Sequence, residues 1–141
     1  MINKNFKILN IDHVAVATEN IENLKFLFVD ILGMNSSKKE YVKDEDVNVQ
    51  KFFADNKDTV IELLESKEEN SPINKYINKK GKGIHHIALT VDNIENAIKY
   101  LIDKGIYLVY DKPKLGSDNK LITFIHPKSS PGILIELCQK V

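Results

Sequence analysis

Residues 11–23, IDHVAVATENIEN, recur with few changes as residues 84–96, IHHIALTVDNIEN. A second echo lies further along, where IEL at 61–63 returns as IEL at 135–137. Self-similarity at a fixed spacing is the signature of a repeated structural unit. We therefore predict two copies of one unit within a single domain that spans 1–141. The first copy covers about 10–66, a connector about 67–82 and the second copy about 83–139.

Each copy is expected to begin with a strand, because residues 12–18 and 84–91 are short runs rich in Val, Ile and Ala. A helix should follow, since apolar residues after Asn93 recur with helical spacing. Asn20 and Asn93 are the expected N-caps, and Gly33 and Gly105 the glycines that end the helices. Three strands are predicted after each helix, at residues 34–42, 47–53 and 59–65 and again at 107–110, 121–125 and 133–138.

The connector is expected to hold a short helix, which Ser71 caps and which Pro72 opens at its first position. With this helix set aside, each copy has the order strand, helix and three strands. The sequence thus predicts an α+β fold of two tandem βαβββ units that form a curved mixed sheet.

Composition excludes several classes of function. The chain has 141 residues with 20 basic and 20 acidic side chains, and every basic residue is Lys. This balance provides no sustained basic surface, so nucleic acid is not an expected partner. No apolar run approaches the roughly 20 residues that span a bilayer, so no membrane association is expected. The single cysteine, Cys138, fits a reducing compartment, and we expect a cytoplasmic protein.

The candidate chemistry lies in residues that the repeat duplicates. His13 and His86 share strand faces with small residues, which leaves room for a concavity beside each imidazole. Glu62 and Glu136 lie in the middle of predicted strands among apolar neighbours, where an unpaired carboxylate is costly to bury. Two imidazoles and two carboxylates suit a divalent ion such as Co²⁺, Ni²⁺, Mn²⁺ or Zn²⁺. A curved sheet would bring the four side chains into one metal-binding cleft.

Two further histidines are not expected to bind the metal. His85 stands next to His86 and must point to the opposite face of its strand. His126 precedes a proline and has no counterpart in the first copy, which indicates a residue in a loop or at the end of a strand.

The sequence resembles the vicinal oxygen chelate superfamily, which includes glyoxalase I, and within it the methylmalonyl-CoA epimerases. The resemblance rests on IDHVAVAT, on IELLE followed by SPINKYI, on GKGIHHIALTVDNIENAI and on KLGSDNKLITFIHPKSSPGILIEL. These segments cover most of residues 10–139. The HPKS segment followed by GILIEL is the most specific of them.

The resemblance implies a metal-dependent epimerisation of methylmalonyl-CoA by proton transfer at C2, through a metal-stabilised enolate. It implies metal ligands at His13, Glu62, His86 and Glu136, with Co²⁺ favoured, and a homodimer. Glu136 would be one acid/base. The other would be Glu45, although the acidic run also leaves Asp44 and Asp46 open. Lys128 and Ser129 of HPKS are the expected substrate-binding residues.

Two other functions stay open at this point. A glyoxalase I-type lactoylthiol lyase, acting on a methylglyoxal–thiol hemithioacetal, would use the same four ligands. The chain has no Arg to hold the carboxylates of glutathione, which disfavours that substrate. The third hypothesis is that the chain is a small-molecule-binding protein of the same superfamily that holds no metal. Such proteins typically lose ligands, whereas all four positions are filled here.

Overall fold

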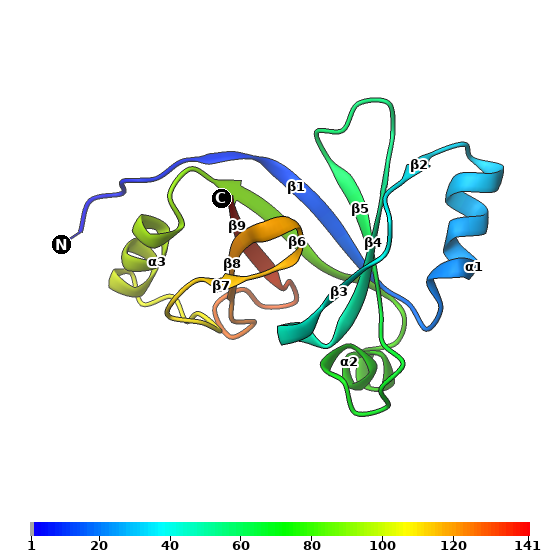
Figure 1. The fold of residues 1–141 in the computed structure, drawn as a ribbon. Coiled ribbons are helices and arrows are strands. Elements are labelled where there is room, and N and C mark those ends of the chain that lie inside the picture. The colour runs from blue at the N-terminus through cyan, green and yellow to red at the C-terminus, as the bar shows by residue number, and fades with distance from the viewer. Residues whose placement is uncertain (1) are drawn as a thin grey trace. The chain divides into compact units, whose positions relative to one another are not determined.

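The computed structural model describes residues 2–141, and Figure 1 shows its helices and strands. The first copy of the repeat contains β1 (Ile8–Ala17), α1 (Ile21–Lys25), the π-helix η1 (Phe26–Ile31), β2 (Asn35–Ser36), β3 (Glu40–Val42), the 3₁₀ helix η2 (Lys43–Glu45), β4 (Val47–Phe53) and β5 (Val60–Glu65). After α2 (Pro72–Lys80), the second copy contains β6 (Gly83–Val91), α3 (Ile94–Asp103), β7 (Lys114–Leu115), the 3₁₀ helix η3 (Ser117–Asn119), β8 (Lys120–Ile125) and β9 (Ile135–Lys140). The α+β fold of tandem βαβββ units is therefore confirmed.

The chain divides into two compact units, and the division falls within β1 and β6. The first unit is His13–His85, and the second combines the described part of Met1–Asp12 with His86–Val141. Among the described residues, no helix is both long enough and apolar enough to cross a membrane.

In the first unit the strands follow the order β2-β4-β5-β1, and β3 pairs with β4. β1 and β5 are parallel, whereas the other pairs are antiparallel. One face of this sheet packs against α1 through Ile21, Phe52 and Leu63. The other face is apolar towards α2, whose Ile73 and Ile77 join a cluster with Ala15, Ala17, Val42, Val47, Val49 and Leu64.

The second unit repeats this plan with the order β6-β9-β8-β7, in which β6 and β9 are parallel. Its helix α3 buries Ile94, Ala97 and Ile98 against one face of the sheet, together with Val91 and Leu137. On the other face Ala88, Ile122 and Cys138 form a smaller apolar cluster.

The predicted helix signals are confirmed. The side chains of Asn20 and Asn93 accept hydrogen bonds from the first turns of α1 and α3, and Ser71 does the same for α2. Gly33 and Gly105 have φ values of 78° and 77°, the left-handed conformation that ends a helix at little steric cost.

Each copy also holds its helix to its last strand in a way that the sequence did not reveal. The backbone N–H of Ile21 donates to the Glu65 carboxylate at 2.7 Å, and the N–H of Ile94 donates to Gln139 Oε1 at 2.7 Å. The same contact is therefore made once by a carboxylate and once by a neutral amide.

Two predicted strands are wrong. Residues 34–42 form two short strands instead of one. Between them, the carbonyl of Ser37 accepts a hydrogen bond from the side chain of Gln50 on β4 at 2.8 Å, where a regular ladder would use a backbone N–H. Residues 107–110 contribute only an isolated bridge at Leu108. There the backbone N–H of Tyr107 donates to Ser129 Oγ instead of extending a ladder. The strand that precedes β8 is β7, seven residues beyond Tyr107.

Candidate metal centre

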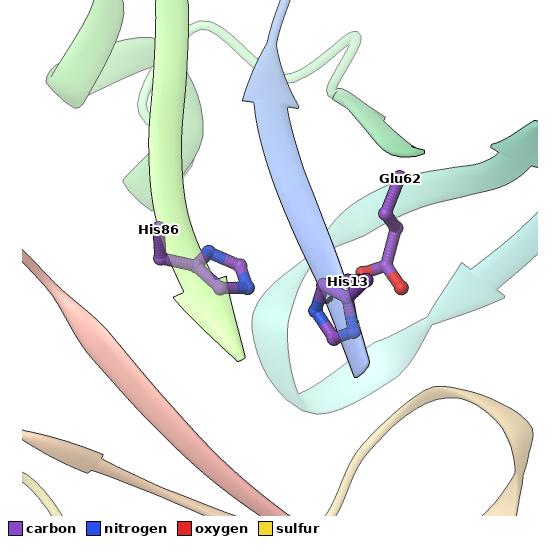
Figure 2. Close-up of side chains that lie close together, drawn as sticks. All are labelled: His13, Glu62 and His86. Atoms are coloured by element: carbon purple, nitrogen blue, oxygen red, sulfur yellow. Dashed lines mark ion pairs between the residues drawn. The ribbon is translucent and has the colours of Figure 1, made fainter. Parts of the chain in front are cut away.

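The first unit brings His13 and Glu62 together on one face of its sheet. β1 and β5 run parallel with Ala15 opposite Glu62, so His13 lies two positions before the residue that faces this glutamate. His13 Nε2 is 3.6 Å from Glu62 Oε1, and both residues are nearly inaccessible, at 2% and 5% exposure. Figure 2 shows the two side chains extending from β1 and β5 towards each other.

The second unit makes the same pair from His86 and Glu136. β6 and β9 are parallel with Ala88 opposite Glu136, which repeats the register of the first pair. His86 Nε2 is 3.0 Å from Glu136 Oε1, and both residues are buried. The ring of Phe124 on β8 packs edge-to-face on His86, with a centroid distance of 5.4 Å, and restricts the imidazole.

Small residues explain why these side chains fit. Ala15 and Ala88 are fully buried directly opposite the two glutamates. A larger side chain at either position would fill the space that the carboxylate and the imidazole occupy. Each alanine lies two positions after its histidine and therefore on the same face of the strand.

The donor atoms of each pair suit a divalent ion. Ligand atoms bound at about 2.1 Å lie about 3.0 Å apart at a right angle and about 3.4 Å apart at the tetrahedral angle. The nitrogen–oxygen separations of 3.0 Å and 3.6 Å are close to these values. Imidazole nitrogen and carboxylate oxygen are ligands for Zn²⁺, Co²⁺, Ni²⁺ and Mn²⁺. The residues present therefore fit such an ion.

The acidic run after β3 separates into three different environments. Glu45 is half-buried and ends η2, which leads into β4, the strand beside Glu62. Asp44 is exposed. Asp46 adopts a left-handed conformation with φ of 49° and accepts a hydrogen bond from the Tyr41 hydroxyl at 2.8 Å. That bond to an anionic acceptor raises the pKa of Tyr41.

Lys128 and Ser129 lie in the turn between β8 and β9. The Lys128 ammonium lies 4.4 Å from the centre of the Tyr107 ring, and Ser129 Oγ accepts from the backbone of the same tyrosine. His126 is exposed and its Nδ1 accepts from the N–H of Lys128, which confirms a residue at the end of a strand.

His85 packs edge-to-face on Tyr76, with ring centroids 4.5 Å apart. It thus has a packing role on the strand that carries His86.

Cys138 shares the face of β9 that carries Glu136, and it is fully buried. Burial raises the pKa of its thiol to about 12, and the nearby carboxylates of Asp12 and Glu136 add to this effect. The thiol is therefore neutral at physiological pH.

The fold and the paired His–Glu sites define a class of protein, and comparison with known families agrees. Residues 12–124 match the Glyoxalase/Bleomycin resistance protein/Dioxygenase superfamily, to which the chain belongs.

Within that superfamily, several of the similar proteins are methylmalonyl-CoA epimerases. The mitochondrial methylmalonyl-CoA epimerase of Dictyostelium discoideum is 37% identical over 131 residues, which cover 92% of this chain and 78% of that protein. The crystal structure of methylmalonyl-CoA epimerase from Mycobacterium tuberculosis has a TM-score of 0.89 at 30% identity, covering 95% of this chain and 89% of that one.

A Streptomyces coelicolor methylmalonyl-CoA epimerase variant in complex with 2-nitronate-propionyl-CoA has a TM-score of 0.88 at 27% identity, covering 96% of each chain. These relatives belong to an enzyme class, and the resemblance found in the sequence is confirmed.

Proposed function

We propose that the chain is a metal-dependent methylmalonyl-CoA epimerase, in which the two repeats act as one domain. The observation that carries the proposal is the buried His–Glu pair that recurs in both units with the same strand register. The choice of substrate is supported by the similar methylmalonyl-CoA epimerases described above. We propose that His13, Glu62, His86 and Glu136 hold one divalent ion, with Co²⁺ favoured.

The reaction requires removal and return of the proton at C2 of the substrate. This carbon lies between a thioester and a carboxylate, so its deprotonation places negative charge on the thioester oxygen. A divalent cation, when bound, supplies positive charge beside that oxygen and the substrate carboxylate. The residues of the chain are left with the proton transfer itself.

Inversion needs one acid/base group on each face of the planar carbon. We assign Glu136 to one face and Glu45 to the other. One carboxylate takes the C2 proton, and the other, in its carboxylic acid form, gives a proton to the opposite face. Glu136 is buried with its carboxylate oxygen 3.0 Å from His86 Nε2, which gives it a defined position for this role.

The acidic run offers Glu45 and Asp46 half-buried and Asp44 exposed, and Asp46 accepts a hydrogen bond from Tyr41. We assign the second acid/base to Glu45 on the resemblance to the epimerases, and the variants below test it against Asp44. We further propose that Lys128 and Ser129 bind the substrate. We also propose that the protein is a homodimer and that it is located in the cytoplasm.

Conversion of one pure epimer tests this function. With (S)-methylmalonyl-CoA and Co²⁺-loaded protein, we expect the (R)-epimer to form until both are equal. Glu45→Gln should abolish inversion, and the matched change Asp44→Asn should leave it intact. No inversion by the loaded wild-type protein, with metal binding intact, would reject the epimerase.

A glyoxalase I-type reaction is the second candidate. The observation in its favour is Glu at position 62, the residue that the resemblance to glyoxalase I implies there. Turnover of methylglyoxal with a thiol other than glutathione, in the absence of epimerase activity, would establish this candidate instead.

A further inference from the structure

A second buried polar cluster lies in the second unit, outside the four candidate ligands. Lys120 Nζ lies 2.8 Å from Asp12 Oδ2, and Thr90 Oγ1 donates to the other oxygen of Asp12 at 3.1 Å. All three residues are at most 8% exposed. A lysine is rarely buried to this degree, because removing its ammonium from water is costly even when it is paired.

The first unit shows that the fold does not require this cluster. Cys138 lies opposite Ile122 as Leu64 lies opposite Val49, so β8 and β9 pair in the same register as β4 and β5. The residue before β8, Asn119, has φ of 55°, as Asp46 before β4 has φ of 49°. Lys120, the first residue of β8, thus corresponds to the first residue of β4, which is Val47.

Two of the three corresponding positions in the first unit are apolar. Thr90 corresponds to Ala17, just as His86 corresponds to His13, and Ala17 and Val47 belong to the apolar cluster beneath α2. Asp12 corresponds to His85, which packs on Tyr76. The first unit therefore has two apolar residues and a histidine at this location, whereas the second unit buries an ion pair there.

A buried ion pair is poor evidence of a contribution to stability. Replacing such a pair with apolar side chains of similar volume often leaves stability unchanged or raises it. What the pair supplies is a defined geometry, because a misplaced partner leaves a charge buried without compensation. A role in geometry fits the location, since Asp12 is joined by a peptide bond to His13.

The other two members of the cluster, Thr90 and Lys120, lie on strands that also carry His86 or a residue that packs on it. Thr90 is on the same face of β6 as His86. Lys120 is on the same face of β8 as Phe124, whose ring packs on the His86 imidazole. We infer that Asp12, Lys120 and Thr90 form a positioning network that sets the backbone of both metal-binding histidines. This inference rests on the proposed metal centre.

The test uses a double variant, Asp12→Leu with Lys120→Met, which removes both charges and keeps the volume similar. The readouts are the Kd for Co²⁺ by calorimetry and the Tm of the chelator-treated protein. We expect a Tm close to that of the wild type and Co²⁺ binding weakened about 10- to 100-fold, as when outer-shell partners of metal ligands are lost. Lys120→Arg keeps the cation and should retain most of the affinity.

Lys82→Met is the matched control, since it removes an exposed ion pair with Glu19 at 3.9 Å and should change neither readout. If the double variant does not fold, Asp12→Asn replaces it, because the amide retains the shape and loses the charge. If the variant that folds binds Co²⁺ with the affinity of the wild type, the positioning network is overturned and the metal centre is not. Failure of the wild-type protein to bind Co²⁺ would overturn the metal centre, and the network with it.

Discussion

Replacement of Glu136 by Gln should remove most of the stabilisation that a divalent ion gives to the folded protein. The Glu136 carboxylate is buried, with its oxygen 3.0 Å from His86 Nε2, so the second His–Glu pair loses its anionic ligand. Loss of an outer-shell partner alone weakens metal binding by about 10- to 100-fold. For a ligand we expect at least the upper end of that range, about 100-fold.

The magnitude follows from binding linkage. An ion at about 100 times its Kd stabilises the wild-type protein by about 2.7 kcal/mol, and at the same concentration a variant with 100-fold weaker binding gains only about 0.4 kcal/mol. For a chain of this size 1 kcal/mol corresponds to about 3 °C in Tm. The metal-induced rise in Tm should therefore fall from about 8 °C to about 1 °C.

Thermal unfolding with and without Co²⁺ provides the assay, and Glu65→Gln is the matched control. Glu65 is equally buried, but its carboxylate accepts from the N–H of Ile21, a contact that Gln139 makes with an amide in the second unit. Glu65→Gln should keep the full metal-induced rise. An undiminished rise in Glu136→Gln would refute the assignment of Glu136 as a ligand.

Three further predictions concern single residues. Glu62→Gln should retain epimerase activity, because an amide oxygen can still face the ion from β5; loss of all metal binding, measured by calorimetry, would contradict this. Asn93→Ala should destabilise the protein by about 1 kcal/mol through loss of the α3 cap, and Asn93→Gly by only a few tenths, as measured by denaturant unfolding; equal losses would argue against the cap. Asp46→Asn should lower the pKa of Tyr41 towards its ordinary value, because the raised pKa arises mainly from the hydrogen bond to the anionic Asp46. An NMR titration of the Tyr41 ring measures this pKa, and an unchanged midpoint would exclude that cause.

Much of the fold could be predicted because the sequence contains two copies of the same structural unit. The repeat placed His13 and His86 at equivalent strand positions, and alternation along each strand placed small residues on the same face. The structure adds the register, in which each glutamate lies opposite an alanine beside its histidine. The capping residues Asn20 and Asn93 were also visible, since their signal is local in the sequence.

The features that could not be predicted depend on contacts between distant residues. Lys120 is one of twenty lysines in the sequence, and nothing beside it indicates that Asp12 is its partner. Residues 107–110 have the composition of a strand, but their backbone is partly satisfied by the Ser129 hydroxyl. Sequence periodicity reports which face of an element is buried, whereas these contacts are set by how the elements pack.

The measurement that tests the central claim most directly is proton NMR of methylmalonyl-CoA in D₂O. The C2 proton signal is followed with chelator-stripped protein, with the same protein reloaded with Co²⁺, and with Co²⁺ alone. We predict rapid loss of the signal only with the reloaded protein, since the proton removed at C2 is replaced by deuterium. Retention of the signal by reloaded protein that binds Co²⁺ would contradict the proposed proton transfer on this substrate.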